Sequence, residues 1–95
     1  MSTTIEHRPE AARFEARVGG HLAVCSYRRQ GALLVLPHTE VPVALQGQGV
    51  AAALVAATLA WARQEGLRVR PTCSYVAAYM RRHVETQDLL ETAVG

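Results

Sequence analysis

The sequence lacks the features that mark export, membrane insertion or nucleic-acid binding. Its start contains no apolar stretch like a signal peptide, and its longest segment without a charge, residues 41–62, is interrupted by Pro42, Gly47 and Gly49. Basic residues occur at most two in a row, and the formal net charge is only +2. We therefore expect neither a membrane partner nor a nucleic-acid partner.

Cysteine is scarce as well. Cys25 and Cys73 are the only two, and they form no C-x-x-C pair. Because no export signal is visible, we interpret them as reduced thiols and place the protein in the cytoplasm. The two cysteines and the four histidines show no metal-ligand spacing, so we expect no metal site.

What remains is sufficient for a small globular fold. The 95 residues suit one domain, and an apolar fraction of 49% is ordinary for a folded chain. Residues 1–10 are polar and include Pro9. We expect a flexible N-terminal tail over these residues and a single domain over residues 11–95.

The first half of that domain alternates apolar and polar side chains, which is the period of a β-strand. Glycine-containing pairs at Gly19-Gly20 and Gln30-Gly31 separate the alternating segments as tight turns. The pattern predicts an antiparallel three-stranded meander. Its strands are expected at residues 14–18, 21–29 and 32–41.

The third of these strands carries the polar residues of most interest. The alternation places His38 and Glu40 on the same side as Leu34 and Leu36. Pro37 interrupts the strand and indicates an edge, a bulge or a break.

The second half changes to a helical period. Residues 49–65 are almost entirely apolar and predict a covered helix, which Gly66 ends. Residues 67–73 predict a short strand, and Ser74 is the expected cap of a second helix over residues 75–83. The residues that follow are weakly patterned. The order of the elements predicts an α+β fold.

The segment before the first helix is the strongest motif. Gly47 and Gly49 lie between a strand and a helix, where backbone N–H groups converge on an anion. A purely structural turn is one alternative. A dinucleotide-binding turn is another, but the preceding hairpins and the short chain argue against it.

The chain resembles the GNAT superfamily of N-acetyltransferases, whose motif is Gln/Arg-x-x-Gly-x-Gly/Ala. Residues 46–51, QGQGVA, match that motif between a strand and a long helix. The segments HTEVP (residues 38–42) and PTCSYVAAYMRRH (residues 71–83) are similar to the small, single-domain GNAT-like proteins of largely unassigned substrate. The resemblance implies a GNAT-like fold without the N-terminal helices of full-size members, which build much of the acceptor pocket.

The resemblance also implies acetyl-CoA, or coenzyme A, as the cofactor. The pantetheine arm would lie where the strand at residues 36–41 and the strand at residues 69–73 splay apart. The pyrophosphate would lie on the main chain of the glycine turn. The expected cofactor-binding residues are Val41, Gln46, Gly47, Gln48, Gly49, Val50, Ala51, Cys73, Tyr75, Tyr79 and His83.

Four residues are candidates for catalysis, each with a plain structural alternative. Glu40 and His38 are candidate bases that accept a proton from the amine. The structural alternative is that Glu40 is a solvated surface carboxylate and His38 a packed ring. The resemblance places Tyr79 where a tyrosine protonates the leaving thiolate, with Tyr75 as a substitute. Cys73 is a candidate acetyl acceptor in a two-step route, and otherwise a small residue in a tight turn.

Two functions of different class follow from this interpretation. The first is an N-acetyltransferase acting on an amine, carried by a small molecule such as a polyamine or by a protein lysine. The alternative is a coenzyme A-binding regulatory or interaction module with weak or no catalysis, and a purely structural interaction domain is the minimal interpretation. A homodimer would supply walls that the small chain lacks.

Overall fold

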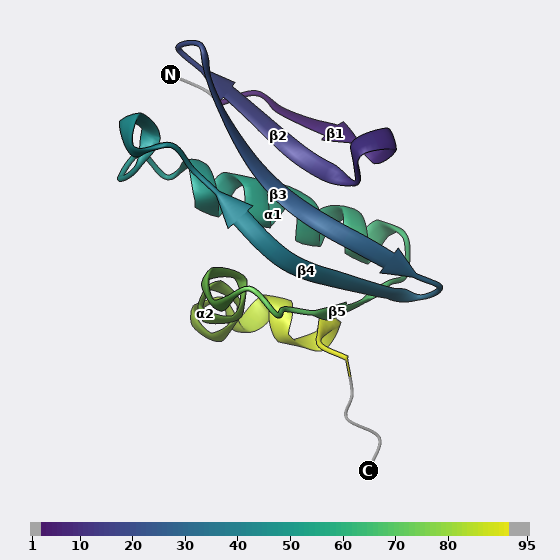
Figure 1. Ribbon diagram of the computed structural model, residues 1–95. Helices are drawn as coiled ribbons and strands as arrows, with labels where there is room; N and C mark the ends of the chain where they lie inside the picture. Colours follow the sequence, from purple (N-terminus) through teal and green to yellow (C-terminus); the bar gives the residue numbers. More distant parts are fainter. Residues whose placement is uncertain (1–2, 92–95) are drawn as a thin grey trace.

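A five-stranded sheet forms the centre of the computed structural model, which describes residues 3–91 (Figure 1). The strand order is β1-β2-β3-β4-β5, with the first four strands antiparallel and β5 parallel to β4. The prediction of an α+β fold is therefore confirmed. The strands are β1 Ile5–Arg8, β2 Arg13–Val18, β3 His21–Gln30, β4 Leu33–Glu40 and β5 Arg68–Arg70.

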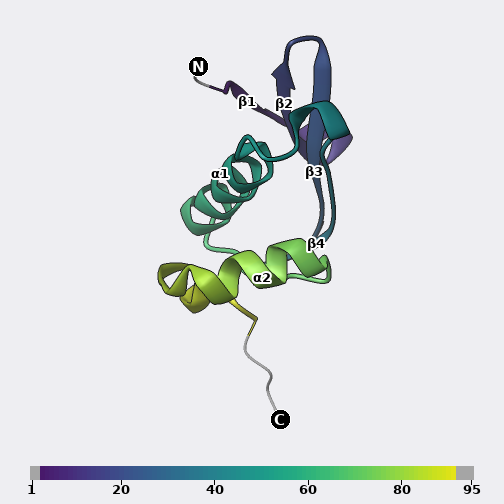
Figure 2. The same cartoon turned by 90° about the vertical axis from the view of Figure 1, so that its left-hand side faces the viewer.

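Both α-helices lie on one face of the sheet, and within the described residues no helix covers the other face (Figure 2). The helix α1 (Val50–Gln64) packs against β2 and β3, and α2 (Ser74–Arg82) lies beside β4. Apolar side chains of β4, α1, β5 and α2 form the centre of the core. The short 3-10 helices are η1 Pro9–Ala11, η2 Val43–Leu45 and η3 Val84–Leu89.

The expected flexible tail is wrong for residues 5–8, which form the edge strand β1 against β2. His7 holds this strand to the core. Its ring stacks on Phe14 with centroids 4.2 Å apart, and its Nε2 lies 2.6 Å from the hydroxyl of Tyr27. The segment looks polar in sequence because its inward-facing ring belongs to a histidine. The meander therefore has four strands.

The prediction of an irregularity at Pro37 is confirmed as a β-bulge. Ser26 pairs with His38, but Arg28 pairs with Val35, so two residues of β4 oppose one of β3. After this extra residue, each side chain of β4 points to the face opposite to the one that simple alternation from Leu34 would give.

The expectation that His38 and Glu40 share the face of Leu34 and Leu36 is therefore wrong. Leu34 and Leu36 face the core, yet His38 and Glu40 point to the face without helices. Thr39 faces the core side instead, directly opposite Cys25.

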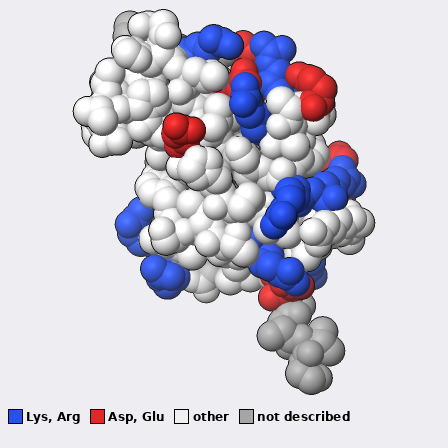
Figure 3. Space-filling model, viewed as in Figure 1, with Lys and Arg blue, Asp and Glu red and all other residues white. Residues whose placement is uncertain are grey.

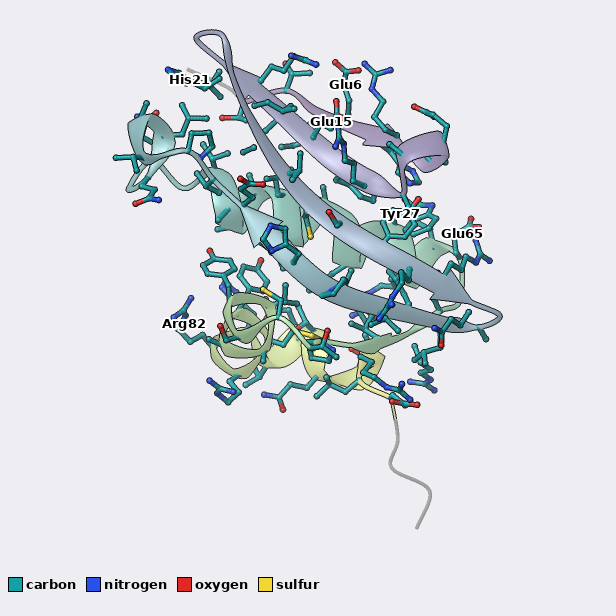
Figure 4. All side chains as sticks on the ribbon, in the orientation of Figure 1. Glu6, Glu15, His21, Tyr27, Glu65 and Arg82 are labelled. Atoms are coloured by element: carbon teal, nitrogen blue, oxygen red, sulfur yellow. The ribbon has the colours of Figure 1, made fainter. Side chains whose placement is uncertain are left out.

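The end of α1 at Gly66 is confirmed. The amide of Leu67 donates to the carbonyl of Ala62 (2.9 Å), and the amide of Gly66 donates to that of Arg63 (3.2 Å). This is the Schellman arrangement, and Leu67 is buried beneath it. Figure 4 shows Tyr27 and Glu65 near this end of the helix.

The second half of the chain differs from expectation in two details. The strand does not reach Cys73, because β5 ends at Arg70 and the chain turns, with the Thr72 amide donating to the Arg70 carbonyl. Ser74 is not the cap of α2, since it is already helical and Cys73 occupies the N-cap position.

The segment after α2 folds back on the core. Arg63 of α1 makes a two-pronged ion pair with Asp88 (2.7 and 2.9 Å), and Arg70 makes one with Glu91 (2.7 and 2.6 Å). Leu90 forms an isolated parallel bridge with Val69. Across residues 3–91, no helix combines the length and the apolar character needed to cross a membrane.

Candidate functional site

The parallel strands β4 and β5 separate after a short paired region. They pair only over residues 33–35 and 68–70, and the last contact is the amide of Cys73 donating to the carbonyl of Leu36 (2.9 Å). The bulge at Pro37 bends β4 at this point, while the turn after Arg70 takes the chain into α2. Beyond this point β4 and the segment after β5 part, where the resemblance implied that two strands splay, although β5 itself ends at Arg70.

A cleft of about 570 Å³ lies beside the end of β4. Its size falls within the roughly 300–1,000 Å³ of small-molecule sites. Its lining residues come from the end of β4, the η2 turn, the first turn of α1 and the start of α2. The lining residues are Thr39, Glu40, Val41, Leu45, Gln46, Gly47, Gly49, Val50, Ala51, Ala52 and Tyr75.

The glycine turn has the backbone conformation that its sequence predicts. Gly47 and Gly49 have φ values of 81° and 78°, which side chains rarely tolerate. A Cβ atom at either position would meet nothing within 4 Å, so the main chain faces open space. The side-chain amides of Gln46 and Gln48 donate to the carbonyls of Val41 (3.1 Å) and Ala44 (3.0 Å) and hold the turn in place.

The N-terminus of α1 is open to an anion. Its first main-chain bond runs from the amide of Ala53 to the carbonyl of Gly49 (3.0 Å), which leaves the amides of Val50, Ala51 and Ala52 without a helical partner. No side chain caps this end and no acid lies in the first turn. The 15-residue helix adds its dipole, equivalent to about half a positive charge.

Cys73 lies at the point where the strands part. It is half-buried, and its Sγ is 3.8 Å from Oγ1 of Thr39, which lines the cleft. Burial acts to raise the pKa of Cys73, but hydrogen bonding from the amides of Val76 and Tyr75 favours the thiolate. The hydroxyl of Thr39 adds to that effect, and the resulting pKa lies below the ordinary cysteine value.

Glu40 lines the cleft, whereas His38 does not, and both side chains point to the face of the sheet away from the helices. Their side chains are 70% and 60% exposed, and His38 Nε2 is 3.6 Å from Glu40 Oε2. Figure 3 shows charged side chains over β1 and β2, along the right-hand side and at the bottom of this face, whereas the surface at the upper left, near the end of β4 and η2, is largely uncharged. The carboxylate of Glu40 is therefore accessible to a cationic group.

The structure separates the two candidate tyrosines. Tyr75 lines the cleft, but Tyr79 is buried one turn further along α2 and lines a second cavity of about 220 Å³ between α1 and η3. The Tyr79 ring stacks on His83 with centroids 3.9 Å apart. Burial, together with Glu85 and Tyr75, raises the pKa of Tyr79.

The cleft thus brings together most of the predicted cofactor-binding residues. Gln48 braces the turn from outside the lining, and Cys73 touches the lining through Thr39. Tyr79 lines the second cavity instead, and His83 stacks on its ring. The side chain of Arg82 extends away from the ribbon into solvent (Figure 4).

Three lining residues were not predicted: Thr39, Leu45 and Ala52. Thr39 lies between the two candidate bases, and only the bulge turns it inward. Within residues 3–91, no group of three or more potential metal-ligating side chains converges.

Comparisons with known proteins agree with this geometry. A family model described as GCN5-related N-acetyl-transferase matches residues 13–89. Protein NATD1 of Mus musculus is 35% identical over 82 residues, covering 83% of this chain and 74% of the relative. Protein NATD1 of Danio rerio is 32% identical over 88 residues, covering 90% and 80%. The NMR structure of a GCN5-like protein from Staphylococcus aureus superposes with a TM-score of 0.74 at 25% identity, covering 95% of this chain and 89% of that chain.

Proposed function

Because this chain belongs to the GCN5-related N-acetyltransferase family, we propose that it binds acetyl-CoA in the cleft and transfers the acetyl group to an amine. The family carries acyl transfer and a GNAT-like fold with it. The cofactor, the acceptor and the residue roles below are our proposal.

The observation that carries the proposal is the uncapped start of α1 beneath the glycine turn. The amides of Val50 and Ala51 and the main chain of Gly47 and Gly49 are the groups that would hold the pyrophosphate. Hydrogen bonds from N–H groups to charged oxygens are stronger than those to neutral ones. The residues therefore fit a diphosphate, since neither a side chain nor an internal acid competes for the same amides.

Bound acetyl-CoA supplies the acetyl group as an activated thioester. Glu40 and His38 accept the proton of the attacking amine, directly or through water. A backbone N–H of β4 near Glu40 or Val41 stabilises the oxyanion. Tyr79 was the expected acid for the leaving thiolate, but Tyr75 is the tyrosine on the wall of the cleft, and we assign it that role.

Cys73 supports a two-step route. Its thiolate would attack the thioester carbonyl, release the cofactor thiolate and hold the acetyl group as a cysteine thioester. The acceptor amine would then attack that carbonyl, lose its proton to Glu40 and release the Cys73 thiolate.

Both cysteines are free thiols, which supports a reducing, cytoplasmic compartment.

The bare face of the sheet supports the second candidate, a coenzyme A-binding module without strong catalysis. Glu40 and His38 stand on this face with no helix over them among residues 3–91. A small amine would contact few groups there, so a protein lysine or a second copy of this chain must supply the missing wall if turnover is efficient.

A binding measurement with one matched pair of variants tests the donor site. Calorimetry should detect coenzyme A binding to the wild-type protein and a loss of about tenfold or more in Gly47→Ala. Gly20→Ala is the control, because Gly20 has nearly the same backbone strain (φ 80° against 81°) and the same open surroundings, far from the cleft. Equal affinity in both variants, or no binding to the wild type, contradicts the proposal.

Acyl transfer is tested by following free thiol release from acetyl-CoA with polyamines and lysine peptides as acceptors. Acceptor-dependent release supports the enzyme, and saturable binding without release supports the binding module. Intact mass then tests the two-step route: because the sequence contains no lysine, self-acetylation on a lysine side chain cannot obscure an adduct on Cys73. The adduct should be absent in Cys73→Ala and discharged by the acceptor.

A further inference from the structure

A chain of hydroxyl and thiol groups runs from the cleft into the core beneath α1. The thiol of Cys73 donates to Oγ1 of Thr39 (3.8 Å), whose own hydroxyl donates to Sγ of Cys25 (3.9 Å). Cys25 in turn contacts the hydroxyl of Thr58, which donates to the carbonyl of Leu54 (2.8 Å). Cys25 and Thr58 are fully buried, so Thr39 is the member of the chain that lines the cleft.

The direction of these hydrogen bonds depends on the charge of Cys73. A threonine hydroxyl has one proton to donate and can accept as well. While Cys73 is protonated, the Thr39 proton points to Cys25. When Cys73, which is half-buried, loses its proton to solvent, the Thr39 hydroxyl must turn its own proton towards the new thiolate, because a thiolate can only accept.

Cys25, at the buried end of this series of hydrogen bonds, stays neutral. Burial raises the pKa of Cys25, so this thiol remains protonated and keeps a donor of its own. The hydroxyl of Thr58 donates its proton to the Leu54 carbonyl, so the Thr58 oxygen can accept a hydrogen bond from the Cys25 thiol. Rotation of the Thr39 hydroxyl therefore leaves no buried group in the chain without a partner.

We propose that Thr39 is a positioning residue for Cys73: its hydroxyl holds the sulfur at the point where β4 and β5 part and turns to donate to the thiolate. The proposal rests on the two-step route given above for the same site. It explains why the bulge at Pro37 matters, since without the bulge Thr39 would face outward, away from Cys73 and Cys25.

The thiolate of Cys73 also has other stabilising groups. It lies at the N-cap of α2, and the main-chain amides of Val76, Tyr75 and Thr39 also favour it through hydrogen bonds. Helix N-termini favour cysteine thiolates in general. Removal of the Thr39 hydroxyl should therefore raise the titration midpoint of Cys73 without returning it to that of an exposed cysteine.

The test measures alkylation of Cys73 by iodoacetamide as a function of pH, in the protein without coenzyme A, with the site assigned by peptide mass. Thr39→Val keeps the branched shape that suits a strand and removes the hydroxyl. We expect its alkylation midpoint to rise and its rate near neutral pH to fall about tenfold, the size typical of one hydrogen bond to a charged group. Thr39→Ser restores a hydroxyl and should return the midpoint towards the wild-type value.

Thr72→Val is the matched control. Thr72 is the neighbour of Cys73, but its hydroxyl lies near the Leu36 carbonyl (3.4 Å), so its removal should leave the Cys73 midpoint unchanged. Circular dichroism and denaturant unfolding establish that each variant is folded. The proposal is overturned if Thr39→Val leaves the midpoint where it was, if Thr39→Ser behaves as Thr39→Val, or if Thr72→Val gives the same shift.

The result is independent of the proposed function. Alkylation uses no cofactor, so failure of coenzyme A to bind would overturn the acetyltransferase assignment and leave the Thr39 measurement intact. If coenzyme A does bind, acetyl adduct formation on Cys73 should slow in Thr39→Val even at saturating acetyl-CoA.

Discussion

The two ends of α1 are built in opposite ways. At its start, Gly49 occupies the N-cap without a side-chain bond, and no acid complements the dipole. At its end, the Schellman bonds to Ala62 and Arg63 occupy the last carbonyls, and Arg63 is tied to Asp88. One end keeps its polar main-chain groups exposed at a cleft, while the other pairs them within the protein.

The difference separates the end of α1 that packs into the fold from the end at which we propose that the cofactor binds. Near the C-terminal end, His7, Phe14, Tyr27 and Trp61 pack ring against ring, with centroids between 4.2 and 6.2 Å apart. Near the N-terminal end, the side chains are glycine, alanine and valine, which add little packing. The unpaired amides at the start of α1 are therefore held in place by the packing of the C-terminal half of the same helix.

The largest expected effect comes from the packed end. Phe14 is buried at 5% exposure beneath His7 and Trp61, and Phe14→Ala should lower the free energy of unfolding by about 3–5 kcal/mol. Phe14→Leu is the milder companion if the alanine variant does not fold. Denaturant unfolding gives the stability, and the coenzyme A affinity of the folded fraction should be unchanged. A reduced affinity in folded Phe14→Leu would break the division between the two ends.

The second effect comes from the open end and has the opposite signature. Ala51 lies in the first turn of α1 and lines the cleft. In Ala51→Glu the new carboxylate complements the helix dipole, so stability should hold or rise by about 0.3–1 kcal/mol. Coenzyme A affinity should fall about tenfold through repulsion of the diphosphate. Ala56→Glu, an exposed position on the same helix outside the cleft, should retain affinity, and matching losses in both would argue against a diphosphate at this end.

A smaller effect is the pH dependence of the packed end. Burial lowers the pKa of His7 below its ordinary 6.5, although Glu10 and Glu65 act in the other direction. The unfolded chain therefore binds a proton at His7 more readily than the folded protein does. His7 contributes its full stabilisation above about pH 6.5, and that contribution declines as the pH falls towards the folded-state pKa.

Unfolding measured across this range should show the decline in the wild type and a weaker decline in His7→Gln. His21→Gln is the control, because His21 is exposed at the β2–β3 hairpin. If His7→Gln keeps the full pH dependence, another group is responsible.

The smallest effect concerns the ion pair at the end of α1. Arg63 and Asp88 lie on the surface, with side chains 50% and 62% exposed, and such pairs are screened by solvent. Asp88→Asn should change the midpoint of thermal unfolding little and coenzyme A affinity not at all. A loss of affinity would mean that residues 84–91 influence the conformation of the cleft.

The open end was well predicted from the sequence, because glycine at a strand–helix junction has a local cause. Residues 46–51 form the turn and the helix start as expected, and all but Gln48 line the cleft. The side-chain chemistry was harder to predict, since it depends on register. Pro37 indicated an irregularity in the strand, but not that one extra residue there would turn Thr39 to the core and its two neighbours outward.

The packed end was predicted less well for a related reason. The strand β1 buries a histidine where an apolar residue would have revealed the period, and its partners Tyr27 and Trp61 come from distant parts of the chain. Residues 84–91 are likewise placed by long-range contacts, the burial of Leu89 and the ion pairs to Arg63 and Arg70, which no local pattern encodes.

The braces from Gln46 and Gln48 have a kinetic consequence. Their bonds to Val41 and Ala44 hold the loop in one conformation before any ligand arrives. If coenzyme A binds at this loop as proposed, association should require no slow ordering step, and little conformational entropy should be lost on binding. Stopped-flow traces should follow a single exponential whose rate rises linearly with ligand concentration, and removal of both amide side chains should introduce a plateau.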